Sequence, residues 1–377
     1  MPPILLPQEL IDKILGLIPS KSTLRTCSLV SHSWLPASRV LLHGSLTISK
    51  SDIRRLVGLL RSPENTFTPI VRTLELDTDP DDPALNEQLP PLFARLYTFT
   101  YLERLVLCGV QLYTDFKIPL VPSVVSIELI AVLVHSLPIL TSFVSYFPNL
   151  RKLKIASSSI GAGTSFQTEA LHPRLELDTL AIDVSTIGAA FAWLGSSATA
   201  PIARTLDISA KSPPTYAINQ RISAYLRWLG PRLIHLCITL PSFTGSLDFS
   251  VNSSLESLIV HDALSIALEP LPSPTSLPWV VDIAPTTLSF LSLFDNTSTL
   301  TTLTFSITGN LFIRRTVISP HMDDFGRKLS ALQLKTVRLQ LSDDFGTGGR
   351  NAVRTSFVSR LPPAVAGSVV IVGGSGM

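Results

Sequence analysis

The chain has 377 residues, and 45% of them are apolar, which is enough for a large core. Its 30 basic and 28 acidic side chains leave a formal net charge of +2, so no general electrostatic attraction to nucleic acid is expected. The three cysteines are far apart and form no Cys-x-x-Cys pair, which argues against a disulfide framework or zinc site and is typical of a reducing compartment. The chain start lacks the basic segment and long apolar run of a signal peptide. We expect a cytoplasmic or nuclear protein.

The first predicted element is a short helix that begins at Pro7. Proline suits the first turn of a helix because its missing N–H needs no partner there, and Glu9 places a negative charge near the helix N-terminus. Apolar residues then recur on two adjoining stripes. One stripe has Leu10, Ile14 and Leu17, and the other has Ile11, Leu15 and Ile18. The apolar face is therefore wider than one packing contact needs, and Pro19 ends the helix.

Two further short helices are predicted directly after the first. Ser20 or Ser22 can cap a helix that carries Leu24, Cys27 and Val30. A third helix is expected from near Ser31, with Trp34, Val40, Leu41 and Leu42 as its apolar residues. Three helices of this length hold too little core to be stable alone. Their surplus apolar surface is where a neighbouring domain or a partner would bind.

The order and spacing of these residues follow a known pattern. It comprises Leu6, Pro7, Glu9, Leu10, Ile14 and Leu15, then Leu24, Leu29, Val30 and Trp34. This pattern resembles an F-box, and residues 28–36 resemble in particular the F-box proteins of mushroom-forming fungi. The resemblance implies that residues 1–45 bind the Skp-family adaptor of cullin–RING ubiquitin ligases. The adaptor-binding residues it implies are Leu6, Pro7, Leu10, Ile14, Leu24, Val30 and Trp34. An ordinary amphipathic helical start that packs on the main domain is the alternative.

Beyond residue 70 a short apolar pattern recurs, in which the second apolar residue lies three positions and the third five positions after the first. The pattern begins at Val71, Leu102, Leu150, Leu177, Ala203, Leu233, Leu255, Leu288 and Leu334. This is the strand portion of a leucine-rich repeat, and most intervals suit repeats of one strand and one helix. The two long intervals, after Leu102 and after Leu288, have room for an extra element each.

Amphipathic segments at 52–60 and 218–229 predict helices between these strands. Strand, loop, helix and strand, in this order, are typical of a parallel solenoid. The asparagine that often occupies the ninth repeat position is nearly absent, so the array is irregular. The sequence thus predicts an α/β fold in which a three-helix F-box precedes an irregular leucine-rich-repeat solenoid with a parallel sheet at residues 46–377. A mixed α/β domain with a few hydrophobic strands is the alternative.

Two segments deviate from the repeat. From Leu129 to Phe147 the chain has no Asp, Glu, Lys or Arg, a length that approaches a membrane span. Pro138 and His135 interrupt this segment, so we expect one or two buried helices rather than a transmembrane helix. The pattern also occurs at Leu300, too soon after Leu288 for a full repeat, which indicates a local hairpin.

Alternate strand residues would point outward if the strands line a concave face. We expect the residues that contact a target protein to be Arg104, Lys152, Lys154, Asp207, His235 and Arg338. The charges on this face change sign along the array. Such a face favours a protein or peptide ligand over nucleic acid, because a polyanion needs a coherent basic stripe.

Several short motifs of other protein classes occur in isolation. Residues 324–326 and 344–346 both read Asp-Phe-Gly, as in protein kinases, but no glycine-rich loop or His-Arg-Asp segment accompanies them, so both are predicted to be turns. Residues 369–376 resemble a strand before a phosphate-binding turn, and we expect only a final strand. Asp77, Asp79 and Asp81 alternate as in a calcium loop without its later ligands, which indicates an exposed acidic loop. No catalytic residue, metal site or cofactor is predicted.

The resemblance and the repeats together predict a non-catalytic substrate receptor of a ubiquitin ligase. The F-box would bind the adaptor, and through it a cullin, while the repeats hold a target for ubiquitination. Two alternatives remain open. One is an F-box/repeat scaffold without a role in ubiquitination, and the other is a hydrolase or transferase on a mixed fold. Neither a nucleic acid nor a membrane is expected as a partner.

Overall fold

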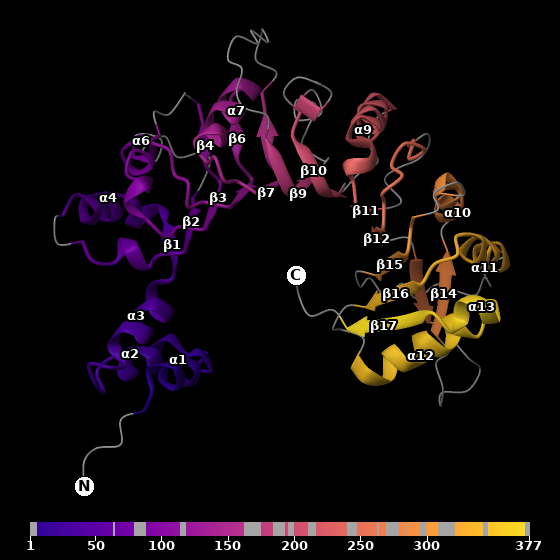
Figure 1. The fold of residues 1–377 in the computed structure, drawn as a ribbon, viewed down its shortest axis with the longest axis horizontal. Helices are drawn as coiled ribbons and strands as arrows, with labels where there is room; N and C mark the ends of the chain where they lie inside the picture. Colours follow the sequence, from indigo (N-terminus) through magenta and orange to yellow (C-terminus); the bar gives the residue numbers. More distant parts are fainter. Residues whose placement is uncertain are drawn as a thin grey trace. The chain divides into compact units, whose positions relative to one another are not determined.

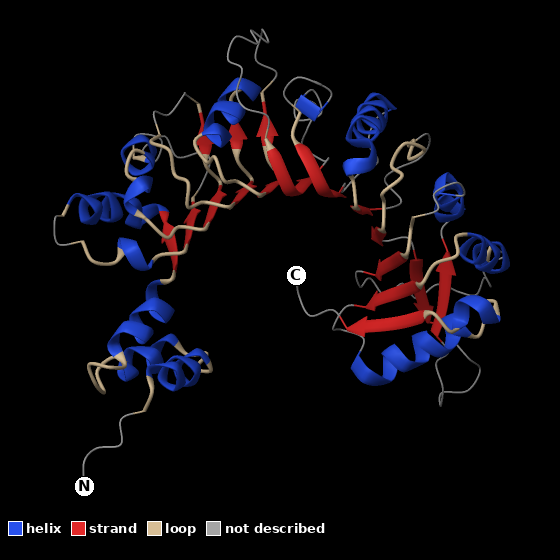
Figure 2. Ribbon diagram, in the orientation of Figure 1, coloured by secondary structure: helices blue, strands red, loops and turns tan. Residues whose placement is uncertain are grey.

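The computed structural model describes residues 6–62, 65–78, 88–113, 118–161, 175–183, 193–194, 200–209, 216–239, 247–261, 264–268, 279–283, 285–294, 299–307, 321–341 and 346–373. The chain divides into two compact units, Met1–Pro173 and Arg174–Met377. In each unit, parallel strands form a sheet with helices along one of its faces (Figure 1, Figure 2). The α/β repeat fold predicted from the sequence is therefore confirmed.

The first unit begins with three short helices, α1 (Gln8–Gly16), α2 (Lys21–Cys27) and α3 (Leu35–His43), as predicted. Ser20 caps α2, because its hydroxyl oxygen accepts a hydrogen bond from the backbone N–H of Thr23 at 3.4 Å. The helices enclose a small core of Ile11, Leu15 and Leu24. The partly buried side chains of Ile18, Cys27, Trp34, Ala37 and Leu42 pack against this core.

Gly44 joins α3 to the first strand without a linker. Its carbonyl oxygen accepts hydrogen bonds from the backbone N–H groups of Arg72 (2.8 Å) and Thr73 (2.9 Å). A Cβ atom at this position would lie 2.6 Å from the carbonyl oxygen of Val40, so the turn needs glycine. The predicted boundary between residues 45 and 46 falls at the start of the first strand.

The sheet of the first unit has one strand per repeat. Its strands, in spatial order, are β1 (Ser45–Ser49), β2 (Thr73–Asp77), β3 (Arg104–Cys108), β5 (Ser126–Ile130) and β7 (Lys152–Ala156). The accompanying helices are α4 (Ile53–Arg61), α6 (Leu89–Phe93) and α7 (Leu137–Ser145), with short 3-10 turns η1 (Lys50–Asp52), η2 (Thr68–Ile70) and η3 (Leu96–Thr98). Leu74, Leu105, Ile127 and Leu153 occupy equivalent positions and are all buried, which confirms the strand pattern beginning at Val71, Leu102 and Leu150.

Three successive repeats turn the same corner after their strands. The residues that follow β3, β5 and β7 are Gly109, Ala131 and Ser157, and their φ angles are 64°, 51° and 50°. Two-residue strands come next, namely β4 (Gln111–Leu112), β6 (Leu133–Val134) and β8 (Ser159–Ile160), which pair in parallel. A left-handed residue thus redirects each repeat toward its helical side, at a steric cost for alanine and serine that glycine does not have.

The second unit continues the same architecture. Its parallel strands, in spatial order, are β9 (Glu176–Asp183), β10 (Ile202–Ser209), β11 (His235–Thr239), β12 (Ser257–His261), β15 (Thr302–Ile307), β16 (Thr336–Leu341) and β17 (Val369–Gly373). The helices are α9 (Tyr216–Leu229), α10 (Pro285–Leu291), α11 (Met322–Ala331), α12 (Gly346–Val358) and α13 (Pro363–Ala366), with turns η5 (Gly230–Arg232) and η6 (Ser292–Phe294). An antiparallel pair, β13 (Leu264–Leu268) and β14 (Trp279–Ile283), is inserted before β15.

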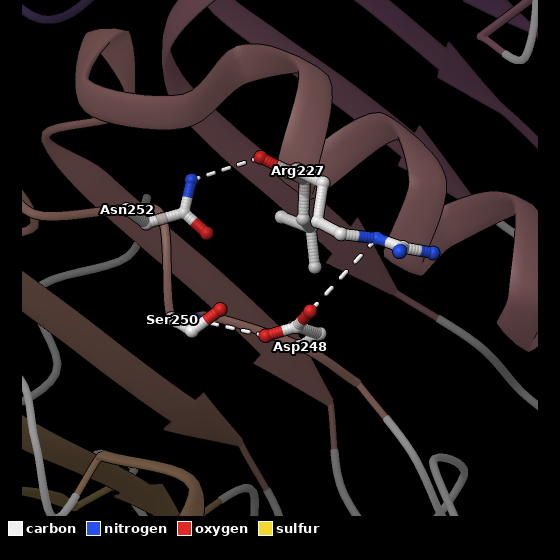
Figure 3. Close-up of polar contacts among 5 residues, drawn as sticks. Arg227, Asp248, Ser250 and Asn252 are labelled. Atoms are coloured by element: carbon white, nitrogen blue, oxygen red, sulfur yellow. Dashed lines mark hydrogen bonds and ion pairs between the residues drawn. The ribbon is translucent and has the colours of Figure 1, made fainter.

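The end of α9 is fixed to the loop that leads into β12 (Figure 3). The buried amide of Asn252 donates hydrogen bonds to the carbonyl oxygens of Leu226 and Gly230, each at 2.9 Å. Asp248 accepts a hydrogen bond from the backbone N–H of Ser250 at 3.0 Å, and its carboxylate lies 3.9 Å from Nε of Arg227. Hydrogen bonds from Ser250 lower the pKa of Asp248, and the charge of Arg227 acts in the same direction. The loop therefore supplies donors to carbonyls that the helix end leaves open.

The uncharged segment at 129–147 was predicted as one or two buried helices, and half of that prediction is wrong. Its first part completes β5 and forms β6, and only α7 is helical. Val124, Ile127 and Leu129 repeat the strand spacing and are fully buried. Most of the segment is buried or half-buried, as a strand and a core helix both can be. Its exposed residues are Ala131, Leu133, His135 and Pro138. The extra repeat strand fills the long interval after Leu102.

Two predictions near residue 300 are also wrong. Leu288 lies in α10 and not in a strand, while Leu300, Leu303 and Phe305 precede or belong to β15, which pairs in parallel with β12 and β16 rather than forming a hairpin. The first two apolar positions of the pattern are three residues apart, a spacing that also fits one face of a helix. Pro285 at the first position of α10 favours the helix.

The isolated motifs have structural roles where the structure describes them. Residues 324–326 were predicted to be a turn but lie inside α11, where Phe325 is buried against Phe305 and Phe357. The final strand predicted from Val369 is confirmed as β17. Asp77 ends β2. Residues 79, 81, 344, 345 and 374–376, which complete the other motifs, lie outside the described residues.

Candidate functional site

The N-terminal helices carry exposed apolar side chains at a much higher density along the chain than the repeats do. Eight exposed large apolar side chains lie within residues 6–41, against ten in all the rest of the described chain. They are Leu6, Leu10, Ile14, Leu17, Leu29, Val30, Val40 and Leu41. Such a density on so small a module is typical of a surface that another protein covers.

The two stripes of α1 have opposite roles. Ile11 and Leu15 face the module core, with 2% and 0% of their surface exposed. Leu10, Ile14 and Leu17 face outward, with exposed fractions of 45%, 41% and 83%. The outward stripe therefore stays open while the inward stripe holds the helix in place.

The seven predicted adaptor-binding residues divide in the same way. Leu6, Pro7, Leu10, Ile14 and Val30 are exposed. Leu24 is buried and Trp34 is half-buried against the core, so these two side chains support the surface from below. Leu17, Leu29, Val40 and Leu41 extend the exposed surface and were not among the predicted contacts, although Leu17 continues the stripe of Leu10 and Ile14.

A second candidate surface is the sheet face of the first unit that carries the alternate strand residues, here called the open face. Side by side on neighbouring strands lie Thr47, Glu75, Val106, Glu128 and Lys154, and next to them Ser45, Thr73, Arg104, Ser126 and Lys152. Three predicted target-binding residues, Arg104, Lys152 and Lys154, are therefore close together. Arg104 is already engaged, because its guanidinium lies 2.6 Å from a carboxylate oxygen of Glu128.

The open face of the second unit carries the other three predicted target-binding residues but does not bring them together. Asp207 and Arg338 lie in one row of the sheet, on strands four spacings apart, which is about 19 Å. His235 lies in the adjacent row and is exposed. These three residues form no common polar cluster.

A polar contact on this second face was not predicted. The thiol of Cys237 lies 3.0 Å from Nε2 of His261. Burial raises the pKa of the Cys237 thiol, and the carboxylate of Asp207 raises it further through its charge and a hydrogen bond. A thiol held in its neutral form is a poor nucleophile, so the arrangement does not favour cysteine catalysis. The pairing of the consecutive strands β10, β11 and β12 brings these residues together. The repeat pattern predicts that the strands are neighbours but not that these side chains touch.

The described residues contain no group of three or more His, Cys, Asp or Glu side chains arranged to hold a metal ion. Nor is any helix among them both long and apolar enough to cross a membrane.

No protein-family model matches the chain, and no curated protein matches it. Among solved structures, the chain is similar to an internalin (InlF) from Listeria monocytogenes. The match has a TM-score of 0.33 and 14% sequence identity and covers 88% of this chain and 93% of the internalin chain. At this level of similarity, nothing about binding or activity transfers from the internalin to this protein.

Proposed function

We propose that this protein is a non-catalytic substrate receptor of a Skp–cullin–F-box ubiquitin ligase. The N-terminal module binds a Skp-family adaptor, and through it a cullin, while the leucine-rich repeats hold a target protein. The observation that carries the proposal is the exposure of the outward stripe of α1 and of Val30. Other residues form the core of the three N-terminal helices, so these side chains remain open to a partner. The resemblance of residues 28–36 to F-box proteins of mushroom-forming fungi supports the same assignment.

In this proposal the contact residues are Leu6, Pro7, Leu10, Ile14 and Val30, and Leu24 and Trp34 hold them in position. Binding would remove the exposed apolar side chains from water. Each Å² of apolar surface buried in this way would stabilise the complex by about 25 cal/mol. The target-binding residues proposed for the repeats are Arg104, Lys152, Lys154, Asp207, His235 and Arg338. The protein works in the cytoplasm or nucleus and contributes proximity between target and ubiquitin-charged enzyme rather than a chemical step.

Co-purification with a Skp-family adaptor tests the adaptor-binding half of the proposal. Ile14→Asp places a charge on the outward stripe without touching the core, so we expect loss of the adaptor from a folded protein. Arg55→Asp makes a similar change on the exposed side of α4 and should retain the adaptor. The proposal fails if the wild type does not bind the adaptor, or if Ile14→Asp binds as well as Arg55→Asp.

A scaffold that binds the adaptor without promoting ubiquitination is the second candidate, since it would use the same exposed stripe. The two are separated by reconstituting the protein with adaptor, cullin and a ubiquitin-charged enzyme. Transfer of ubiquitin to a bound protein, lost in Ile14→Asp, supports the receptor. Adaptor and cullin binding without any transfer supports the scaffold.

A further inference from the structure

The open face of the first unit has opposite charges at two ends. Glu75 and Asp77 lie on β2, and Lys152 and Lys154 lie on β7. Asp77 and both lysines are exposed, and Glu75 is half-buried. In the described part of the chain, none of these four side chains has an ion-pair partner within 4.0 Å. The hydroxyl of Thr47 donates a hydrogen bond to Glu75 at 3.1 Å, which leaves its negative charge uncompensated.

The strands between these two ends are electrically neutral. Arg104 and Glu128 neutralise each other at 2.6 Å, and the side chain of Glu128 is only 17% exposed. Val106 lies between Glu75 and Glu128 in the same row, and Cys108 and Ile130 follow in the next. The middle of the face therefore carries no charge other than an ion pair that is already satisfied, and Ser126 is a further polar residue there.

Cys108 pairs with Asp77 on the neighbouring strand and lies close to the acidic end. Burial raises the pKa of this thiol, and the carboxylates of Glu75, Asp77 and Glu128 raise it further, in that order. The negative potential thus reaches the middle of the sheet beside β2. Because neighbouring basic side chains do not cancel it, a cation above β2 would be attracted there.

The distance between the two ends fixes the size of a matching ligand. From β2 to β7 there are three strand spacings, across β3 and β5, which is roughly 14 Å. An extended peptide advances about 3.3–3.4 Å per residue, so roughly four residues bridge the two ends. A nucleic acid has only negative charges to offer and would be repelled by the acidic end.

We propose that the open face of the first unit binds an extended segment of a target protein that crosses the strands from β2 to β7. The segment carries a Lys or Arg over Glu75 and Asp77 and an Asp or Glu over Lys152 and Lys154. These opposite charges are about four residues apart, with an apolar residue between them over Val106. The proposal rests on the proposed function of the repeats as a target-binding surface and adds the chemistry of the target.

Selection from a phage-displayed library of random heptapeptides on the immobilised full-length protein tests this proposal. We expect the enriched peptides to carry opposite charges three to five residues apart more often than the starting library does. On a Lys152→Glu, Lys154→Glu variant, the acidic position should be lost from the enriched peptides and replaced by a basic one. The control variant Arg54→Glu, Arg55→Glu makes the same charge change on the exposed side of α4. It should select the same peptides as the wild type.

The most enriched wild-type peptide then gives a quantitative measurement by fluorescence anisotropy. Since each exposed ion pair contributes only weakly, the loss of two pairs and two new repulsions should weaken binding roughly tenfold. Absence of enrichment, enrichment without charge spacing, or the same peptides on the Lys→Glu variant would each overturn the proposal. Adaptor co-purification uses separate residues, so failure of this target inference and failure of the ligase assignment remain distinguishable.

Discussion

The thiol of Cys237 lies 3.0 Å from Nε2 of His261, on the neighbouring strand of the second unit. Burial and the nearby carboxylate of Asp207 raise the pKa of this thiol, so the folded protein contains little Cys237 thiolate near neutral pH. Alkylation requires the thiolate. We therefore expect Cys237 to react with iodoacetamide at pH 8 much more slowly than Cys27, which is half-buried in the N-terminal module.

Mass spectrometry of the digested protein after timed alkylation measures both rates in one sample. The control is the same experiment in denaturant, where the difference between Cys27 and Cys237 should disappear because unfolding restores the ordinary thiol pKa. Equal rates in the folded protein would contradict a buried, neutral Cys237.

Neighbouring residues of α1 should differ sharply in their effect on stability. Leu15 is fully buried in the core of the N-terminal module, and Ile14 is 41% exposed. Leu15→Ala removes packed methyl groups and leaves a cavity, so we expect a loss of about 2–5 kcal/mol in the stability of the module. Ile14→Ala should cost roughly 0.5 kcal/mol or less, as surface substitutions usually do.

Amide hydrogen exchange of α1, α2 and α3 measures this stability locally. Faster exchange in Leu15→Ala across all three helices, with Ile14→Ala close to wild type, is the expected result. If both variants exchange alike, the two stripes of α1 do not have the inward and outward orientation found here.

Asn252 stabilises the end of α9 through two donors. Its amide reaches the carbonyl oxygens of Leu226 and Gly230, and it is fully buried. Asn252→Ala leaves both carbonyls without this donor, so we expect the free energy of unfolding to fall by about 1–3 kcal/mol. Asn252→Asp keeps the size but lacks the N–H donors and should be at least as harmful.

Denaturant unfolding of the full chain, followed by circular dichroism, measures this effect. Ser253→Ala, at the exposed neighbouring position, serves as the control and should leave the midpoint unchanged. An Asn252→Asp variant as stable as the wild type would show that the two hydrogen bonds do not hold the helix end.

Local patterns predicted the repeat strands well because a strand with one face in the core needs an apolar residue at every second position. Leucines such as Leu74 and Leu153 must alternate with outward residues wherever a sheet has one buried face. The pattern failed at Leu288, where an interval of three residues fits a helix equally well. The lack of charge in the segment after Leu129 did not indicate strand or helix, because buried residues of either kind are apolar.

The side chains that form the surfaces were harder to predict than the positions of the strands. Periodicity placed Leu10 and Leu15 on different stripes of α1 but could not say which stripe faces the core, because both are equally apolar. Contacts such as Arg104–Glu128 and Cys237–His261 depend on which strands are neighbours. The strand that carries Glu128 was not predicted, and the strand pattern does not fix which outward side chains touch.

The repeat corner after β5 should tolerate glycine better than its natural alanine. Ala131 has a φ of 51°, whereas Gly109 has 64° at the equivalent position after β3. The left-handed conformation costs a residue with a Cβ about 1–2 kcal/mol. Glycine loses roughly 0.5–1 kcal/mol through backbone entropy, so Ala131→Gly should be neutral or stabilise the protein by up to about 1.5 kcal/mol.

Gly109→Ala is the reciprocal change and should destabilise the protein by about 1 kcal/mol or more. Thermal unfolding of both variants beside the wild type gives the comparison. A clear loss of stability in Ala131→Gly together with a gain in Gly109→Ala would contradict the corner geometry.

Two glycines inside helices should respond oppositely to alanine. Gly58 in α4 has no atom within 4 Å of a built Cβ, so Gly58→Ala should gain about 0.5–1 kcal/mol from helix propensity. At Gly326 in α11, a Cβ would lie 2.6 Å from Cδ of Pro362. The proline ring is rigid, so α11 must shift, and overpacking of this kind costs about 1–3 kcal/mol. A lower melting temperature for Gly326→Ala and a higher one for Gly58→Ala would therefore assign the glycine of this Asp-Phe-Gly triplet to helix packing. Equal gains in melting temperature for both variants would show that the close approach of residue 326 to Pro362 has no energetic effect.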